Sequence, residues 1–221
     1  MNAVKEEVCS MPEIRRNALT GEIVVIAVER SKRPIAFGKK VICCPFCPEN
    51  AHLTPPDHYK TKDERVRVFD NKYPIFTPED DEAYGRHEVL VDTNRHGERL
   101  QDFSETDIYE VLKALVSRQV ILEKDPKIKY VQVFKNEKEN AGASLEHSHW
   151  QIAATSYIPQ RQAKMTENAS KYTKEHGSCY LCDSIQKLDA LLVTENESFV
   201  STFKSYLKNV MRNVKMQKRS S

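Results

Sequence analysis

The stretch of residues 131–159, VQVFKNEKENAGASLEHSHWQIAATSYIP, constrains the fold of this chain more than any other. Its two ends are rich in β-branched and aromatic residues, which favour strands, and the polar segment between them contains Gly142, which favours a chain reversal. The stretch therefore predicts a strand, a turn and a second strand. Because successive side chains of a strand point to opposite faces, His147, His149 and Gln151 should share one face.

Two histidines on a half-exposed strand have an ordinary interpretation in which they do no chemistry. We favour a functional one here, because titratable groups beside a turn that can hold a phosphate are typical of functional sites. An imidazole with a pKa of about 6.5 is mostly neutral in neutral solution and can attack an electrophilic phosphorus. Backbone N–H groups from Gly142 to Ser144, the Ser144 hydroxyl and the Asn136 and Gln151 amides would then surround the phosphate oxygens.

The pair Cys44-Pro-Phe-Cys47 predicts a zinc site, since a gap of two residues lets both thiolates bind one ion. A redox dithiol is the alternative, and it should stand where a strand meets a helix. The following segment, PENAHLTPP, is rich in proline and does not favour a helix, so a metal is the better interpretation. Four of the six cysteines fall in Cys-x-x-Cys pairs, which favours metal binding in the cytosol over disulfides.

Asn136, Gly142-Ala-Ser144 and His147-Ser-His149-Trp-Gln151 together resemble the active-site segment of the galactose-1-phosphate uridylyltransferase family. That family is a branch of the histidine-triad superfamily and includes ADP-glucose phosphorylase. The resemblance implies that His149 takes the nucleotidyl group covalently and that His147 is a zinc ligand. It implies the zinc ligand set Cys44, Cys47, His96 and His147, with His52 as the alternative. Trp150 departs from the family, which usually has a small residue there.

Two further segments resemble the same family. TGEIVVIAVERSKRP, in which we expect a buried strand over Ile23–Val28, is similar to the family's opening strand. This resemblance implies that Arg30 and Arg33 lie near the nucleotide phosphates, although composition alone would favour a solvated strand end. VRVFDNKYP is similar to a segment that places Asn71 against the ribose or phosphate, and a turn-forming role explains this asparagine equally well. His87 starts a strand outside the family's ligand positions, so we expect it to be structural.

The fold class that these elements predict is α+β, with a mostly antiparallel, histidine-triad-like sheet, a zinc knuckle and a truncated second module. One long helix should pack on the sheet. Ser104 and Asp107 form a capping signal, and an apolar stripe follows on one helical face, made of Ile108, Val111, Leu112, Leu115 and Leu122. Residues 1–160 would form the catalytic half, and residues 161–221 a linker, the truncated start of a second half and a basic tail.

The second half that the resemblance implies begins at Cys179-Tyr-Leu-Cys182. Only His176 lies near this pair, so we expect a second metal site there to be weakly occupied or completed by another chain. Since triad-type sites are commonly built between two halves, the chain is expected to form a homodimer that covers an unpaired sheet edge.

Composition narrows the function. The formal net charge of +2 gives no strong field, so neither nucleic acid nor a membrane is an expected partner. No run approaches a membrane span and the start lacks a signal-peptide core, so we expect a cytoplasmic protein. The function favoured is transfer of a nucleoside monophosphate between a nucleotide sugar and a sugar-1-phosphate or phosphate, with zinc as cofactor. The alternatives are a histidine-triad-type nucleotide hydrolase or phosphorylase and an inactive, zinc-stabilised nucleotide-binding remnant.

Overall fold

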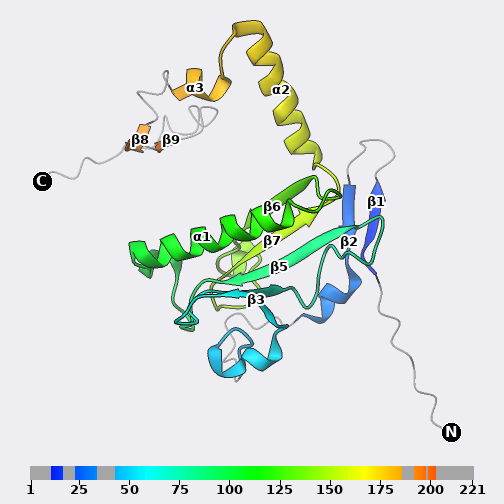
Figure 1. Cartoon of the computed structure of the whole chain (residues 1–221), viewed down its shortest axis with the longest axis vertical. Coiled ribbons are helices and arrows are strands. Elements are labelled where there is room, and N and C mark those ends of the chain that lie inside the picture. The colour runs from blue at the N-terminus through cyan, green and yellow to red at the C-terminus, as the bar shows by residue number, and fades with distance from the viewer. Residues whose placement is uncertain (1–10, 17–22, 34–42, 186–191, 198, 203–221) are drawn as a thin grey trace, which may run out of the picture. The chain divides into compact units, whose positions relative to one another are not determined.

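The computed structural model describes residues 11–16, 23–33, 43–185, 192–197 and 199–202 (Figure 1). The chain divides into two units, Met1–Gln160 and Arg161–Ser221. The predicted basic tail lies outside the described residues. Among the helices described, none is both long and apolar enough to cross a membrane.

The first unit is built on a five-stranded sheet in which every pair of neighbouring strands is antiparallel, as predicted. β5 and β7 occupy its centre, with seven residue pairs in register between them. In spatial order the strands are β3 (Asp57–Lys60), β4 (Arg67–Asp70), β5 (Gly85–Val91), β7 (His149–Thr155) and β6 (Tyr130–Phe134).

The predicted long helix is α1 (Glu105–Leu122), which lies across one face of the sheet (Figure 1). Ser104 caps it: its hydroxyl accepts the Asp107 N–H, and the Asp107 carboxylate accepts the Ser104 N–H. Val111 and Leu115 are buried, and they belong to the same hydrophobic core as buried residues of the sheet. Leu112, placed on the buried stripe by sequence, is instead 51% exposed, because Ala114 occupies the core-facing position of that turn.

The two faces of the sheet have different roles because side chains alternate along β5 and β7. Leu90 and Ile152 are fully buried in the core beneath α1, together with the ion pair between Glu88 and Arg118 of α1. The opposite face carries Val89 and Gln151, which stand opposite each other in register. The predicted strand over HSHWQIAAT starts at His149, two residues later than His147.

A separate two-stranded sheet joins β1 (Glu13–Arg16) to β2 (Ile23–Ile26). The expectation of a buried strand over residues 23–28 is wrong, because β2 pairs only with β1 and Val24 is 56% exposed. Only one side, through Val25, packs on the cluster around Phe76. The described residues of this unit also form four short 3₁₀ helices: η1 (Val28–Lys32), η2 (Pro48–Leu53), η3 (Leu100–Asp102) and η4 (Glu139–Ala141).

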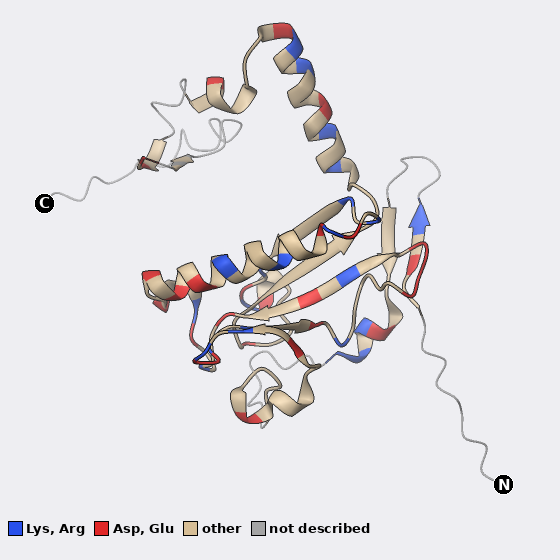
Figure 2. Cartoon of the chain, viewed as in Figure 1, with Lys and Arg blue, Asp and Glu red and all other residues tan. Residues whose placement is uncertain are grey.

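The second unit contains α2 (Gln160–His176), α3 (Tyr180–Ile185) and a hairpin of β8 (Leu192–Glu195) and β9 (Val200–Thr202). Basic and acidic side chains are interspersed along α2 (Figure 2), and no residue of α2 is buried. A helix with both charges around its surface is stabilised locally by pairs such as Lys164–Glu167.

Gly85 shows how closely β5 approaches β7, and it supports a test of the sheet. A Cβ at this position would lie 2.0 Å from the Ala154 carbonyl oxygen and 2.9 Å from the Phe76 Cβ. We therefore expect Gly85→Ala to lower the free energy of unfolding by about 1–3 kcal/mol, because the strands must separate to admit a methyl group. Denaturant unfolding measures this. The exposed neighbour Arg86→Ala is the control, and equal midpoints for the two variants would contradict the close approach.

Candidate active site and metal cluster

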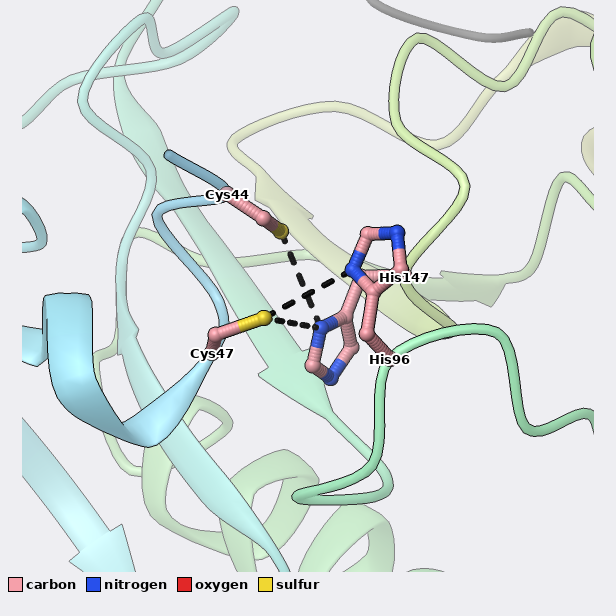
Figure 3. A group of neighbouring side chains, drawn as sticks. All are labelled: Cys44, Cys47, His96 and His147. Atoms are coloured by element: carbon pink, nitrogen blue, oxygen red, sulfur yellow. Dashed lines mark hydrogen bonds between the residues drawn. The ribbon is translucent and has the colours of Figure 1, made fainter. Parts of the chain in front are cut away.

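Four side chains far apart in the sequence meet at one end of the central strands (Figure 3). Cys44 and Cys47 come from the loop before η2, His96 from the loop after β5, and His147 from the residues just before β7. Their ligand atoms all lie within 4.8 Å of one another. His52, the alternative ligand, is not in this group.

The orientation of His147 suits a metal ligand. Its Nε2–H donates to the Thr93 carbonyl at 2.8 Å, so the Nδ1 lone pair faces the two sulfurs. Nδ1 lies 3.7 Å from Cys44 Sγ and 3.6 Å from Cys47 Sγ, and His96 Nδ1 lies 3.5 Å from Cys47 Sγ. Tetrahedral zinc with usual bond lengths separates sulfur and nitrogen ligands by about 3.5 Å, so the residues fit this ion.

The electrostatics of the pair favour the same ion. Burial, and then the neighbouring Cys44, raises the pKa of the Cys47 thiol to about 12. Two thiolates in so confined a place need a compensating cation. The sequence favours a metal over a redox dithiol because it does not predict a helix after Cys47. A short 3₁₀ helix does follow Cys47, so that expectation is wrong in detail, but the two histidines beside the thiols favour the metal.

His149 is the first residue of β7 and is buried. Its Nδ1–H donates to the His147 carbonyl at 2.8 Å, which leaves the Nε2 lone pair without a proton. Burial lowers the pKa of His149 below its usual value, so the ring is neutral in neutral solution. Phe46 packs edge-on against the ring, with 5.1 Å between centroids. The residue is therefore a fixed, neutral imidazole with one free nitrogen.

The free face of His149 lines a cavity of about 270 Å³. Polar groups that the sequence singled out surround it, and they are Arg30, Arg33, Asn71, Ser144 and Gln151. The rest of the lining is largely apolar and includes Phe46, Leu53, Phe69 and Val89, a composition suited to a nucleobase and ribose beside a phosphate group.

Two predicted residues lie elsewhere. Asn136 and Gly142 are absent from the cavity lining, and the Asn136 amide nitrogen would lie 3.8 Å from a Cβ placed on Gly142. Gly142 has a φ of 85°, a left-handed conformation that glycine adopts without strain. These two residues therefore shape the turn that carries Ser144. Asn71 makes a turn contact, in which its side-chain oxygen accepts the Tyr73 N–H, and the residue also lines the cavity.

His87, which the sequence predicts to be structural, lies next to residues of the cavity. This residue is 2% exposed on β5, and its ring lies within hydrogen-bond distance of Gln151, Arg30 and the Ile75 N–H. Strand alternation is the signal that could have indicated this position. Every second residue of β5, namely 87, 89 and 91, lies on the face of the sheet that carries Gln151 and His149.

The departure at Trp150 is explained on the opposite face. Its indole N–H donates to the Asp92 carboxylate at 2.8 Å. The same carboxylate accepts from Lys135 at 2.7 Å and from Ser148 at 3.1 Å. Because Asp92 is fully buried, this cluster ties together the end of β5, the segment after β6 and the start of β7.

Cys179 and Cys182 lie at the start of α3 and are both exposed. Within the described residues, no group of three or more metal-binding side chains includes them. The expected second metal site therefore has no further ligands in the part of the chain that the structure describes.

This chain is similar in sequence to known proteins. Residues 25–158 match the family described as "Domain of unknown function (DUF4931) N-terminal domain". ADP-glucose phosphorylase from Arabidopsis thaliana is 29% identical over 216 residues, covering 86% of this chain and 61% of that protein. Galactose-1-phosphate uridylyltransferase from Thermotoga maritima is 28% identical over 210 residues, covering 89% and 63%.

The same two kinds of protein are similar to this chain among solved structures. The crystal structure of an ADP-glucose phosphorylase from Arabidopsis thaliana with bound ADP-glucose superposes with a TM-score of 0.69 at 28% identity, covering 87% of this chain and 64% of that one. A uridylyltransferase structure superposes with a TM-score of 0.74 at 27% identity, covering 89% and 63%. The chain thus spans less than two thirds of the length of these relatives.

The buried state of His87 predicts a pH dependence of stability. Burial, and then Arg30, lowers its pKa from 6.5 to about 3. Between these two pH values the unfolded chain binds a proton that the folded chain does not, so stability falls as the pH falls below 6.5. This one residue contributes a slope of up to about 1.4 kcal/mol per pH unit. Urea unfolding at several pH values should give a shallower slope for His87→Gln, and identical slopes would contradict the assignment.

Proposed function

The chain belongs to the DUF4931 family, whose N-terminal domain matches residues 25–158, and from its similarity to uridylyltransferases and ADP-glucose phosphorylase we propose that it is a nucleotidyltransferase. It would move a nucleoside monophosphate between a nucleotide sugar and a sugar-1-phosphate or phosphate through a covalent nucleotidyl-His149. The observation that carries the proposal is the neutral His149 ring, which lines a cavity together with two arginines and whose Nε2 has no hydrogen-bond partner among the described residues.

The reaction proceeds in two displacements. In the first, the His149 Nε2 lone pair attacks the α-phosphorus, a P–N bond forms, and the P–O bond to the departing sugar phosphate breaks with its electron pair leaving on that oxygen. In the second, an oxygen of the acceptor phosphate attacks the same phosphorus, and the P–N bond breaks to restore neutral His149. The Nδ1–H bond to the His147 carbonyl stabilises the positive charge on the ring of the intermediate.

Four polar residues of the cavity would bind the phosphate groups of the substrate. Arg30 and Arg33 supply positive charge, and Ser144 and Gln151 supply hydrogen-bond donors to the phosphoryl oxygens as negative charge grows on them. Burial, and then Arg33, lowers the pKa of Arg30 to about 10, and an anionic ligand would relieve that repulsion. Asn136 and Gly142, also predicted to contact substrate, act here through the shape of the turn.

A nucleotide sugar is the substrate class we propose. Its support is the related phosphorylase structure, which contains ADP-glucose. The hydrolase alternative would use the same His149 but let water discharge the intermediate, and the remnant alternative would bind nucleotide without forming an adduct. Product analysis with and without phosphate separates transfer from hydrolysis.

Zinc is the metal we propose for Cys44, Cys47, His96 and His147. Bound there, it would neutralise the two thiolates and join the loop before η2 to the start of β7. His147 would hold the ion through Nδ1. Because His149 is only two residues further along the chain, fixing His147 would also restrain the backbone that positions His149. The domain division at residue 160, with the catalytic chemistry in the first unit, is part of the same proposal.

A homodimer is the assembly we propose, by contact of the first unit with a second copy. β6 is an edge strand, so its outer backbone groups can pair with β6 of another copy about a two-fold axis. α1, which packs near β6 and β7, carries an exposed apolar stripe of Tyr109, Leu112, Val116 and Val120, each more than half exposed. A two-fold contact would cover both features with the same surface.

Nucleophile prediction. Incubation with ADP-glucose should give a covalent nucleotidyl adduct, detected by mass spectrometry of the intact protein. His149→Ala should abolish the adduct and keep the metal and the fold, because Nε2 is the attacking atom. His147→Ala should instead lose metal and stability. If the two variants exchange these phenotypes, the roles of the two histidines must be exchanged.

Metal prediction. Purified protein should contain zinc, and Cys44→Ser should lose most of it and unfold at lower denaturant, because the buried site loses a thiolate ligand. Elemental analysis measures the zinc. Cys43→Ser is the matched control, since Cys43 is exposed and outside the cluster, and it should keep its zinc. Undiminished zinc in the Cys44→Ser protein would rule out this ligand set.

Assembly prediction. Light scattering should give twice the chain mass of 25.5 kDa. Val116→Glu should produce monomers, because it places a charge on the apolar stripe, whereas Ser117→Glu at the edge of the stripe and a chain ending at residue 202 should remain dimeric. A wild-type monomer with full transfer activity would refute the proposed contact.

A further inference from the structure

We propose that His87 is a positioning residue that fixes the orientation of the Gln151 carboxamide, so that the Gln151 NH₂ group faces the cavity beside His149. This inference deepens the proposed function and rests on it for its catalytic consequence. Its structural part, the state of the His87 ring, can be tested without any activity.

His87 is placed to control Gln151 by the pairing of β5 with β7. In register, His87 stands opposite Ala153 and Val89 opposite Gln151, so His87 and Gln151 are diagonal neighbours on the cavity face of the sheet. The His87 Nε2 atom lies 3.0 Å from Gln151 Oε1. The histidine itself is buried and is not part of the cavity lining. It therefore acts on the cavity through Gln151.

The proton of His87 is located by a main-chain group. The Ile75 backbone N–H points at Nδ1 from 3.0 Å, and a backbone N–H can only donate. The Arg30 guanidinium, also only a donor, lies 3.4 Å from the same nitrogen. Nδ1 must therefore be the unprotonated acceptor. Since burial keeps this ring neutral, its one proton is on Nε2.

The orientation of Gln151 follows from that proton. The Nε2–H of His87 needs an acceptor, and within the described part of the chain only the carboxamide oxygen of Gln151 supplies one, so the NH₂ group must point the other way. A flipped carboxamide would set two donors against each other in a buried place. Among the residues that the structure describes, the Gln151 nitrogen has no hydrogen-bond acceptor, and the residue lines the cavity with His149. Its two N–H groups are thus available to a phosphoryl oxygen.

Asn71 is the other side-chain amide near His87 Nε2, but it cannot accept the His87 proton. Its side-chain oxygen accepts the Tyr73 N–H at 2.9 Å, so its amide nitrogen is the atom that lies 3.3 Å from His87 Nε2. Both atoms carry hydrogens, which makes this a packing contact between donors. Asn71 therefore offers His87 no acceptor, and Gln151 is the sole acceptor for the His87 proton among the described side chains.

The first experiment tests the ring itself. Long-range ¹H–¹⁵N spectra of ¹⁵N-labelled protein distinguish a protonated from an unprotonated imidazole nitrogen, and the His87→Gln spectrum identifies the His87 signals by their loss. We expect neutral His87 with the proton on Nε2 throughout pH 5–8, well above its pKa of about 3. A proton on Nδ1, or titration of this ring within that range, would overturn the proposal.

The second experiment tests the consequence for Gln151. Single-turnover formation of the adduct from ADP-glucose is compared in His87→Gln and His87→Met. The glutamine Nε2 lies as many bonds from Cα as the imidazole Nε2 and still donates, whereas methionine cannot donate. We expect His87→Met to lower the rate constant about 10- to 100-fold with little change in ADP-glucose binding, and His87→Gln to recover most of the rate. Equal loss in both variants would refute the donor role.

A double variant separates positioning from a general loss of structure. If His87 acts through Gln151, then His87→Met should cause no further loss of rate in a Gln151→Ala protein, whereas multiplied losses would indicate an unrelated defect and overturn the proposal. If the wild-type protein forms no adduct, the proposed function fails. The tautomer spectrum then still decides whether His87 orients Gln151, so the two failures are distinguishable.

Discussion

The pairing of β5 with β7 is the constraint on which the rest of the first unit depends. Seven residues of each strand are in register, with Val91 opposite His149 and Val89 opposite Gln151. Because side chains alternate, one register assigns every residue of both strands to the cavity face of the sheet or to the face beneath α1. A slip by one residue would bury Gln151 under the helix and expose Ile152. Gly85, which lets the strands approach closely, is part of the same constraint.

Main-chain atoms, more than side chains, set the chemistry of the three buried histidines. His147 donates through Nε2 to the Thr93 carbonyl, and His149 donates through Nδ1 to the His147 carbonyl. His87 accepts through Nδ1 from the Ile75 N–H. Each contact decides which ring nitrogen keeps its lone pair, and so which one can bind a metal, attack phosphorus or accept a hydrogen bond. Backbone geometry thus gives three similar rings different free nitrogens, on which the three roles proposed for them depend.

The opposite face of the sheet holds this geometry in place with buried charge. Asp92 joins Lys135, Ser148 and Trp150, and Glu88 joins Arg118 of α1. Such groups are costly to bury unless each is paired, and the pairing fixes the segments that carry them. Ser148 and Trp150 alternate along the chain with His147 of the metal cluster and with His149 and Gln151 of the cavity. Trp150 is therefore an anchor on the far side of the sheet from the cavity.

The sequence by itself determined what depends on neighbours along the chain. Strand alternation, the Ser104 cap of α1, the glycine turn at Gly142 and the two-residue gap between Cys44 and Cys47 are local features with local causes. Tertiary structure decided which surfaces meet. It turned Leu112 to solvent, left β2 half-exposed, kept Asn136 out of the cavity and brought His87 against Gln151. Residues 87 and 151 are 64 positions apart, and their contact depends on a strand register that no local pattern near either residue specifies.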